Sequence, residues 1–354
     1  MRVKLGDVCE RGTSNLKLSD VSEKNGEFSV FGASGYIGSV DFYQQGYPYV
    51  AVVKDGAGIG RAMLCPGKTS VIGTMQYLLP KDNILPKYLF YVVKYMNLEK
   101  YFTGATIPHI YFKDYKNEEF NFDFWERQVE IVSVLSKCEK VIDLCKQELQ
   151  LLDKLIKARF VELFGDPVSN SYGLPEATLP DLGEFGRGVS KHRPRNDIKL
   201  LGGKYPLIQT GDVANAGLYI TSYSSTYSEL GLKQSKMWDK GTLCITIAAN
   251  IAKTAILEFD ACFPDSVVGF IANERTNNIF VHYWFSFFQA ILESQAPESA
   301  QKNINLKILS ELKVIVPEKR KQDQFASFVK LTDKSEFVER FPELSLFFKA
   351  YSLL

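Results

Sequence analysis

Short apolar runs alternate with glycine-rich turns throughout residues 1 to 124. Examples are FSVFGASGYIGSV from residue 28, YVAVVKDGAGIG from residue 49 and MQYLLP from residue 75. Runs of this length between such turns are typical of β-strands. Residues 86 to 101 instead carry apolar side chains at helical spacing and predict a helix. The pattern therefore predicts a mixed domain of strands with a helix.

From Trp125 to Phe164 the pattern changes, because glycine and proline are absent. Apolar residues recur there at steps of three and four, as the a and d positions of a coiled coil do. About 40 helical residues would extend roughly 60 Å. Gly165 and Pro167 then end the helix. We call the apolar line the seam, and its residues are Leu135, Cys138, Ile142, Cys145, Leu149, Leu152 and Ile156.

The chain also contains an internal repeat, since residues 107–135 recur in degraded form at 301–329, an offset of 194 residues. Both copies run from a polar turn into a short strand, a charged cluster that ends in glutamine (Gln128, Gln322), and an amphipathic helix. Upstream, YPLIQTGDVANAGLYI matches FSVFGASGYIGSV, LCITIAANIAKTAIL matches YVAVVKDGAGIGRAML, and YWFSFFQAIL matches YLFYVVKYM. A period this long indicates two related domains rather than a solenoid.

The repeat predicts an α+β protein in four parts: a domain at 1–124, a helix at 125–164, a second domain at 165–317 and a second helix at 318–354. The second helix has its own seam, although Pro342 within it would cost about 3 kcal/mol and predicts a shorter or kinked helix. The two seams are expected to pack together as an antiparallel coiled coil. The second seam comprises Phe337, Phe341, Leu344, Phe348 and Tyr351.

Composition narrows the class of protein. The chain has 354 residues, enough for two cores, and a net charge of +1, whereas a free-standing DNA-binding protein is usually basic. Any DNA binding must therefore depend on local patches or on a basic partner. The six cysteines form no CxxC pair and there are three histidines, so no metal site or disulfide framework is predicted. No signal peptide or membrane span is predicted either, and a cytoplasmic location is expected.

Three strings carry a resemblance to a known family. They are LQLLDKLIKARFVELFGDP at 149–167, SAQKNINLKILSELKVIVP at 299–317, and KLGDVCERGTS matched by TLPDLGEFGRGVS. With the order domain, helix, domain, helix, the chain resembles the specificity subunit of type I restriction-modification systems. The resemblance covers essentially the whole chain and departs at the C-terminus, which reads LFFKAYSLL where a counterpart of LIKARFVELFG is expected.

The resemblance implies a function and a set of partners. Each domain would be a target recognition domain that reads one half of a split double-stranded DNA site. The helices would dock two modification (methyltransferase) subunits, and restriction subunits would join them. The chain itself would be non-catalytic and bind no cofactor, whereas its partners would use S-adenosylmethionine, ATP and Mg²⁺.

Two loops are candidates for DNA contact. KDGAGIGRAML at 54–64 lacks a nucleotide-binding signature, and its glycines indicate either a tight strand turn or a close approach of Lys54 and Arg61 to phosphates. The loop RGVSKHRPRNDIKLLGGK at 187–204 holds several basic residues beside Asp197 and is either a DNA contact or a solvated loop. Its candidate cations are Arg187, Lys191, Arg193, Arg195 and Lys199, and elsewhere Lys68 and Lys302 are further candidates.

The turns around His109 and Lys302 are expected to cap structure rather than to read bases. Two other functions stay open at this stage. Pro264-Asp265 with Glu311-Leu312-Lys313 outlines a PD and ExK nuclease site, which would hold Mg²⁺ and make the chain a self-contained nuclease. A non-catalytic scaffold is the other alternative. No methyltransferase signature occurs in the sequence.

Overall fold

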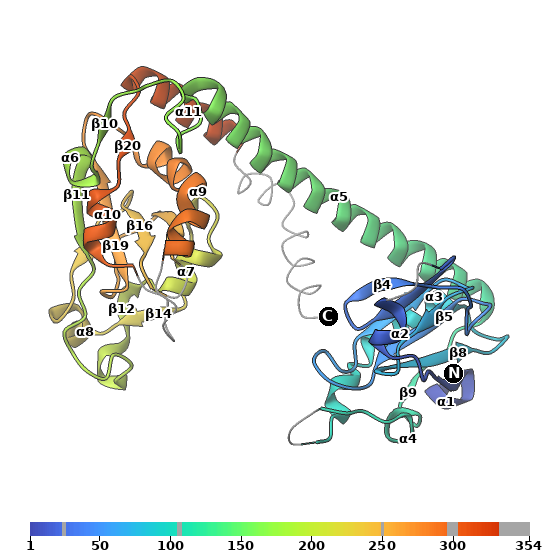
Figure 1. Cartoon of the computed structure of the whole chain (residues 1–354). Helices are drawn as coiled ribbons and strands as arrows, with labels where there is room; N and C mark the ends of the chain where they lie inside the picture. The colour runs from blue at the N-terminus through green and yellow to red at the C-terminus, as the bar shows by residue number, and fades with distance from the viewer. Residues whose placement is uncertain (23–25, 105–107, 249–250, 296–303, 333–354) are drawn as a thin grey trace. The chain divides into compact units, whose positions relative to one another are not determined.

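The computed structural model of the chain describes residues 1–22, 26–104, 108–248, 251–295 and 304–332 (Figure 1). The described residues form two compact units, one of residues 1–146 and one from residue 147 onward. Each unit combines α-helices with mostly antiparallel sheets, so the predicted mixture of helix and sheet is confirmed. Among the described helices, none is both long and apolar enough to cross a bilayer.

The first unit is built on an antiparallel sheet of order β2-β8-β5-β6, beside a smaller sheet of order β4-β3-β7. Strands β1 and β9 pair with each other as a separate two-stranded sheet. Its elements are β1 (Arg2–Lys4), α1 (Leu5–Val8), β2 (Cys9–Thr13), α2 (Leu18–Ser22), β3 (Phe28–Gly32), β4 (Gly35–Val40), β5 (Tyr49–Val53), β6 (Ala62–Cys65), β7 (Ser70–Val71), β8 (Met75–Pro80), α3 (Pro86–Tyr95), η1 (Leu98–Tyr101), α4 (Phe112–Tyr115), β9 (Glu119–Asn121) and the start of α5 (Trp125–Phe164).

Strand β5 is the centre of the first unit, because every one of its residues is buried. Successive side chains of a strand point to opposite faces. Val50 and Val52 accordingly join the cluster that α3 covers, whereas Tyr49, Ala51 and Val53 join a cluster on the other face. The continuous apolar run in the sequence therefore reflects burial on both faces rather than on one.

The second unit repeats this plan. Its main sheet has the order β11-β19-β16-β17-β13 and its smaller sheet the order β14-β12-β18-β15. Its elements are the end of α5, β10 (Glu176–Ala177), α6 (Leu179–Leu182), β11 (Gly183–Arg187), η2 (Ile198–Leu200), β12 (Leu201–Leu207), α7 (Thr210–Asn215), β13 (Tyr219–Ile220), β14 (Ser225–Tyr227), α8 (Glu229–Lys233), β15 (Met237–Trp238), β16 (Leu243–Thr246), β17 (Thr254–Leu257), β18 (Ala261–Cys262), β19 (Val267–Ala272), α9 (Asn278–Gln295), α10 (Leu306–Glu311), β20 (Val314–Ile315) and α11 (Lys319–Leu331).

Strand registers show how closely the halves correspond. The antiparallel pairs β2/β8, β8/β5 and β5/β6 have their counterparts in β11/β19, β19/β16 and β16/β17. Each smaller sheet also contains one parallel pair, β3 with β7 in the first unit and β12 with β18 in the second. The internal repeat seen in the sequence is thus a repeat of strand order.

The two halves differ most between the paired strands of the smaller sheet. In the first unit, β3 and β4 are joined by a tight turn at Ala33 and Ser34. In the second, the equivalent connection runs from residue 208 to residue 224 and contains α7 and the parallel strand β13. The expected match of YPLIQTGDVANAGLYI to FSVFGASGYIGSV therefore holds for the first strand only, because β13 pairs with β17 and not with β12. The carboxylate of Asp212 accepts from the backbone N–H of Gln209 at 2.8 Å and so favours a helix start there.

A second correction concerns residues 86 to 101, where the sequence predicts one helix. Helix α3 ends at Tyr95, and a separate short 3₁₀ turn follows from Leu98. Asn97 between them has a left-handed backbone with φ of 47°, which a continuing helix cannot accommodate. Asparagine tolerates this conformation better than most residues, so the break lies where the sequence allows it.

Helix α5 runs over the 40 residues whose spacing predicts it, and Gly165 follows with φ of 76°. A left-handed glycine just past the last turn is a common helix end. Near this end Phe160 stacks on Phe280 of α9 at 5.3 Å and meets Phe325 of α11 edge-on, also at 5.3 Å. Phe164 joins the same cluster. Aromatic packing thus holds α5, α9 and α11 together within the second unit.

A buried glutamine attaches the start of α5, and another the start of α11, to the neighbouring domain. Gln128 is fully buried, and its amide donates to the carbonyls of Asn83 and Asp123, at 3.0 and 2.9 Å. Its oxygen accepts from the backbone N–H of Leu85, the residue before α3, at 2.9 Å. The side chain therefore links the starts of α3 and α5 through three hydrogen bonds.

Gln322 repeats this arrangement in the second unit. It is also fully buried, and its amide donates to the carbonyls of Arg275 and Pro317, at 3.0 and 2.8 Å. Its oxygen accepts from the hydroxyl of Thr276, just before α9, at 2.9 Å. We call Gln128 and Gln322 the glutamine clamps. The repeated glutamine of the sequence is therefore a buried hydrogen-bonding residue and not part of a solvated charged cluster.

Replacing a clamp should loosen the helix that it holds. Gln128→Leu leaves one N–H and two carbonyls without their partner in the interior, which should cost about 3 kcal/mol. Hydrogen exchange of the intact chain should show lower protection over α3 and the first turns of α5. Gln147→Leu, at an exposed position of the same helix, is the matched control and should change protection little. Equal protection in both variants would contradict the clamp.

His282 fixes α9 to β17, because its Nδ1 lies 2.9 Å from the hydroxyl of Thr254. Burial of the imidazole lowers the pKa of His282 to about 4. The folded protein therefore keeps this ring neutral at pH values at which an unfolded chain, with a pKa of about 6.5, takes up a proton.

The chain should consequently lose stability as the pH falls from about 6.5 to 4, and His282→Gln should remove that part of the loss. We expect the stability difference between wild type and variant to shrink by about 2 kcal/mol between pH 7.5 and pH 4.5. Chemical unfolding of both proteins at the two pH values measures this. A difference that does not change with pH would show that the folded state protonates His282 normally.

Candidate nucleic-acid interface

The glycine loop of the first unit joins β5 to β6 and lies against the turn that contains His109. Gly56, Gly58 and Gly60 all have left-handed backbones, with φ of 86°, 81° and 80°. The backbone N–H of Gly56 donates to Pro108 at 3.0 Å, and the N–H of Ile110 donates to Lys54 at 2.9 Å. The glycines therefore serve a tight connection between strands, and the loop is anchored rather than free.

The two cations of this loop have different surroundings. Lys54 forms an ion pair with Asp55, whose carboxylate is also 2.7 Å from Nδ1 of His109. Partial burial acts to raise the pKa of Asp55, but the bonds to Lys54 and His109 outweigh it and lower that pKa. Arg61 is exposed and donates weakly to the carbonyls of Gly58 and Ala57, at 3.3 and 3.4 Å. Arg61 is thus the better placed of the two for an outside anion.

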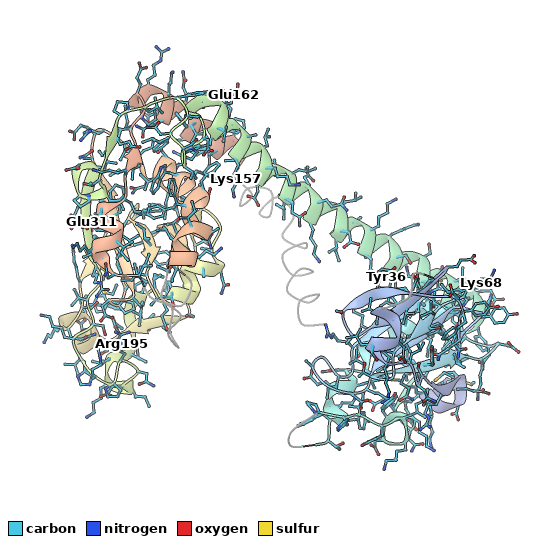
Figure 2. The ribbon with its side chains drawn as sticks, in the orientation of Figure 1. Tyr36, Lys68, Lys157, Glu162, Arg195 and Glu311 are labelled. Atoms are coloured by element: carbon cyan, nitrogen blue, oxygen red, sulfur yellow. The ribbon has the colours of Figure 1, made fainter. Side chains whose placement is uncertain are left out.

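Lys68 lies apart from this loop. It follows β6 at the end where Cys65 pairs with Tyr49, whereas Lys54 and Arg61 lie beyond the other end of the same strand pair. A five-residue strand spans about 16 Å, so the structure does not bring the three together. Lys68 is exposed on the outside of the unit (Figure 2). Tyr36 of β4, with 63% of its surface exposed, is an aromatic side chain on this unit that the sequence did not single out.

The basic loop of the second unit begins at Arg187, the last residue of β11. The protein holds it in place at several points. The backbone N–H of His192 donates to the side chain of Gln234 at 3.0 Å, and the hydroxyl of Ser235 donates to the carbonyl of Val189 at 2.7 Å. Arg193 donates to the carbonyl of Ser190 at 2.6 Å. These bonds argue against a loop that is merely solvated.

Acidic residues neutralise part of this loop, which the sequence alone did not reveal. Asp265 lies 3.5 Å from the guanidinium of Arg193 and forms a closer ion pair with Arg195. Asp197 accepts from the backbone N–H of Lys199 and lies 3.1 Å from the His192 ring, and these bonds lower the pKa of Asp197. The loop is therefore less positive than its composition indicates.

Three cations of the loop stay available. Arg187, Lys191 and Lys199 are exposed, and within the part of the chain that the structure describes no ion pair to them is formed. Together with Arg61 they are the exposed arginines and lysines of the two candidate loops to which no ion pair is formed among the described residues. Lys302 and the second-seam residues Phe341, Leu344 and Phe348 lie outside the described residues.

The nuclease alternative fails on geometry. Asp265 precedes β19 at the end where Val268 pairs with Arg187, and Glu311 lies in α10 beside α6, which precedes the opposite end of the same strand pair. Figure 2 shows Glu311 well away from Arg195, the ion-pair partner of Asp265. The two carboxylates therefore cannot share a metal ion. Glu311 instead lies 3.7 Å from Lys307.

Helix α5 carries two apolar lines. The described seam residues are buried or half-buried, among them Ile142 and Ile156, each only 2% exposed. A second line lies one position earlier and is solvent-exposed, with Leu144 at 52% and Leu151 at 63%. We call this second line the outer stripe, and its residues are Val134, Val141, Leu144, Leu151 and Leu155. Its heptad spacing was readable in the sequence, but the stronger seam obscured it.

Comparison with known proteins identifies the family. The model for the type I restriction modification DNA specificity domain matches residues 1–154 and 176–340. The chain therefore belongs to the family of type I restriction-modification DNA specificity proteins. Its role is DNA recognition, and it is a non-catalytic specificity subunit.

Individual relatives agree with this assignment. A type I restriction enzyme specificity subunit of Methanocaldococcus jannaschii, MjaX, is 22% identical over 292 residues, covering 78% of this chain and 68% of the relative. A second one from the same organism, MjaIX, is 26% identical over 179 residues, covering 45% of this chain and 40% of the relative. The crystal structure of the S subunit from M. genitalium matches with a TM-score of 0.62 at 17% identity, over 98% of this chain and 93% of that one. The last match supports the fold.

Proposed function

We propose that the chain reads a two-part double-stranded DNA target, one half-site with residues 1–124 and the other with residues 165–317. The observation that carries this proposal is the repeated strand order of the main sheets, combined with unlike connections in the smaller sheets. One frame with two sets of loops suits two different half-sites. The helices at 125–164 and 318–354 would pack as an antiparallel coiled coil and set the spacing between the half-sites, as dimer geometry does in other DNA readers.

The roles of the candidate cations are assigned by whether each forms an ion pair. Arg61, Arg187, Lys191 and Lys199 would neutralise phosphates, which fixes position without reading sequence. Arg193 and Arg195 are held by Asp265 with their guanidinium groups ordered, and an ordered arginine is suited to reading guanine in the major groove. Lys54, Lys68 and Lys302 remain lesser candidates. The net charge of +1 is compatible with DNA binding if a partner supplies further positive charge.

The partners would be two modification subunits, with restriction subunits joining them. The outer stripe of α5 supports a docking role, since contiguous exposed aliphatic side chains on a helix are typical of an interface. The modification subunits would bring S-adenosylmethionine, and the restriction subunits ATP and Mg²⁺. This chain would bind none of these for catalysis.

The charge assignment can be tested on the assembled methyltransferase. Methylome sequencing of cells carrying the system gives the motif, and binding to a duplex with that motif is then measured over a range of salt concentrations. Lys191→Ala and Lys199→Ala should each weaken binding and reduce the salt slope by about 1. Asp265→Asn should change affinity by releasing both arginines. Lys307→Ala, whose lysine lies on α10 outside the loop, is the control and should bind as wild type does. Unchanged slopes in both loop variants would exclude the loop from the interface.

The outer stripe makes a separate prediction about assembly. Leu144→Glu and Leu151→Glu place a charge in the proposed contact and should abolish co-purification of the modification subunit, while the chain stays folded by circular dichroism. Gln150→Glu introduces the same residue at an exposed position off the stripe and should leave the complex intact. Normal complexes from the stripe variants would place the docking surface elsewhere.

A further inference from the structure

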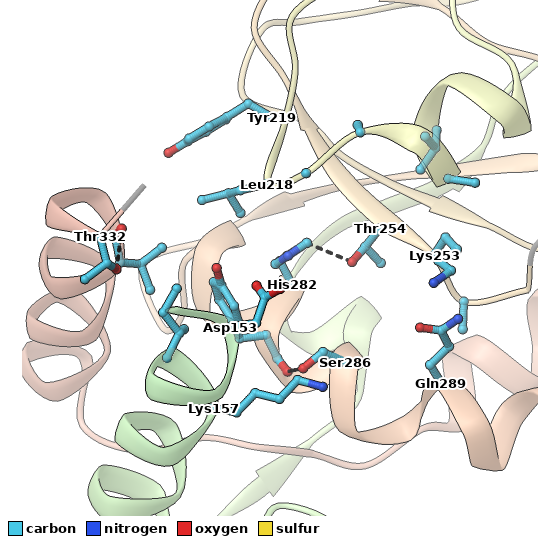
Figure 3. A pocket seen from close by; sticks show the side chains of 18 of the residues that line it. Asp153, Lys157, Leu218, Tyr219, Lys253, Thr254, His282, Ser286, Gln289 and Thr332 are labelled. Atoms are coloured by element: carbon cyan, nitrogen blue, oxygen red, sulfur yellow. Dashed lines mark hydrogen bonds between the residues drawn. The ribbon is translucent and has the colours of Figure 1, made fainter. Parts of the chain in front are cut away.

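The second unit contains a cavity of about 630 Å³, and none of its lining residues belongs to the two candidate loops at 54–64 and 187–204. Residues of α5, α7, β13, α9 and α11 line it, together with the short loop before β17. Figure 3 shows polar side chains from three of these elements facing the same space. Small-molecule sites in proteins commonly measure 300 to 1,000 Å³, so the cavity has the size of a ligand site.

Two lysines enter the cavity from different elements. Lys157 comes from α5 and Lys253 from the loop before β17, and Gln289 and Ser286 of α9 line the space between them (Figure 3). Lys253 is half-buried, and no acidic residue lies within ion-pair distance of it among the described residues. Asp153 is the cavity's carboxylate, and His282 supplies a half-buried imidazole. Because that imidazole is neutral at neutral pH, the lining carries a net charge of +1.

Comparison of the two halves shows that Lys253 has different surroundings from its counterpart in the first unit, Arg61. Lys253 directly precedes β17 as Arg61 directly precedes β6, so the two cations hold equivalent positions. Arg61 lies over the carbonyls of its own glycine loop. Lys253 instead faces α7 and β13, the segment that replaces the tight turn of the first unit. The insertion in which the two halves differ therefore forms one wall of the cavity.

The rest of the lining is apolar or aromatic. Ile156, Leu218 and Val329 are among the apolar lining residues, and Tyr219 and Tyr283 are the tyrosines that line the cavity. A flat ring could lie against these side chains while an anionic group reaches the lysines. Dispersion and stacking against such a wall, combined with a charge-assisted bond, is how proteins hold nucleotides.

We propose that this cavity binds a mononucleotide-sized phosphate ester, with its phosphate between Lys157 and Lys253 and its ring against Ile156, Leu218 and the two tyrosines. Duplex DNA is too wide to enter a space walled by α5 and α9, so the ligand is a free small molecule. Because α5 and α11 both line the cavity, bound ligand would join these two helices within the second unit. The site would make the stability of this helix pair depend on a small molecule.

Calorimetric titration of the full chain tests the site directly. The probes are the four ribonucleoside monophosphates, adenosine and inorganic phosphate. We expect at least one monophosphate to bind, and its nucleoside to bind at least tenfold more weakly. Lys253→Met should weaken binding about tenfold, and Lys253→Arg should restore it. Ala214→Phe, which fills the cavity without changing its charge, should abolish binding, whereas Lys307→Met on α10 should have no effect.

Each contrary result is equally specific. Equal affinity for a nucleoside and its monophosphate, or no effect of Lys253→Met, would overturn the phosphate assignment. If short duplexes of any sequence displaced the nucleotide and Lys253→Met lowered the salt slope of DNA binding, the lysine would serve the DNA backbone instead. Thermal unfolding of every variant shows whether a loss reflects misfolding. DNA methylation in cells is a separate readout, so the site can fail while the proposed DNA reading stands.

Discussion

The buried glutamine clamps are the constraint on which the rest of the structure depends. A glutamine side chain with no solvent access needs hydrogen-bond partners inside the protein. Gln128 finds three in the backbone, and Gln322 finds two backbone carbonyls and the hydroxyl of Thr276. The penalty for an unmatched amide fixes the orientation in which α5 and α11 each start beside their own sheet. Because the same arrangement occurs twice, each domain holds the start of its helix in the same way.

Within that frame, variation is confined to connections. The strand order of the main sheets is shared, but a tight turn in one half corresponds to α7 and β13 in the other. The two candidate loops also differ in the acidic residue that pairs with their cations. Asp55 pairs with Lys54 in the glycine loop, and Asp265 pairs with Arg195 in the basic loop. A DNA reader that keeps its frame and changes its loops can acquire new half-sites without refolding.

Much of this plan could be predicted from the sequence. Helix α5, the repeated domains and the paired strands β5/β6 and β16/β17 follow from local periodicity, which tertiary contacts reinforce here. What failed depended on distant residues. Asp265 is about 70 positions from the arginines that it pairs with, and the separation of Lys68 from Arg61 follows from strand direction. The cavity arises where five elements meet, although the alignment of Arg61 with Lys253 was visible in the repeated strings.

The central claim is that each domain reads its own half-site through a common frame, and a domain duplication tests it most directly. Residues 176–315, bounded by the β10/β20 pair, would be replaced with residues 2–121, bounded by the equivalent β1/β9 pair. The methylated motif would then be sequenced in cells carrying the modification subunit. If each domain reads its own half-site, the methylated motif of the altered chain should keep one half-site of the parent motif and contain it twice, as an inverted repeat. An unchanged motif, or one unrelated to either parental half-site, would contradict it.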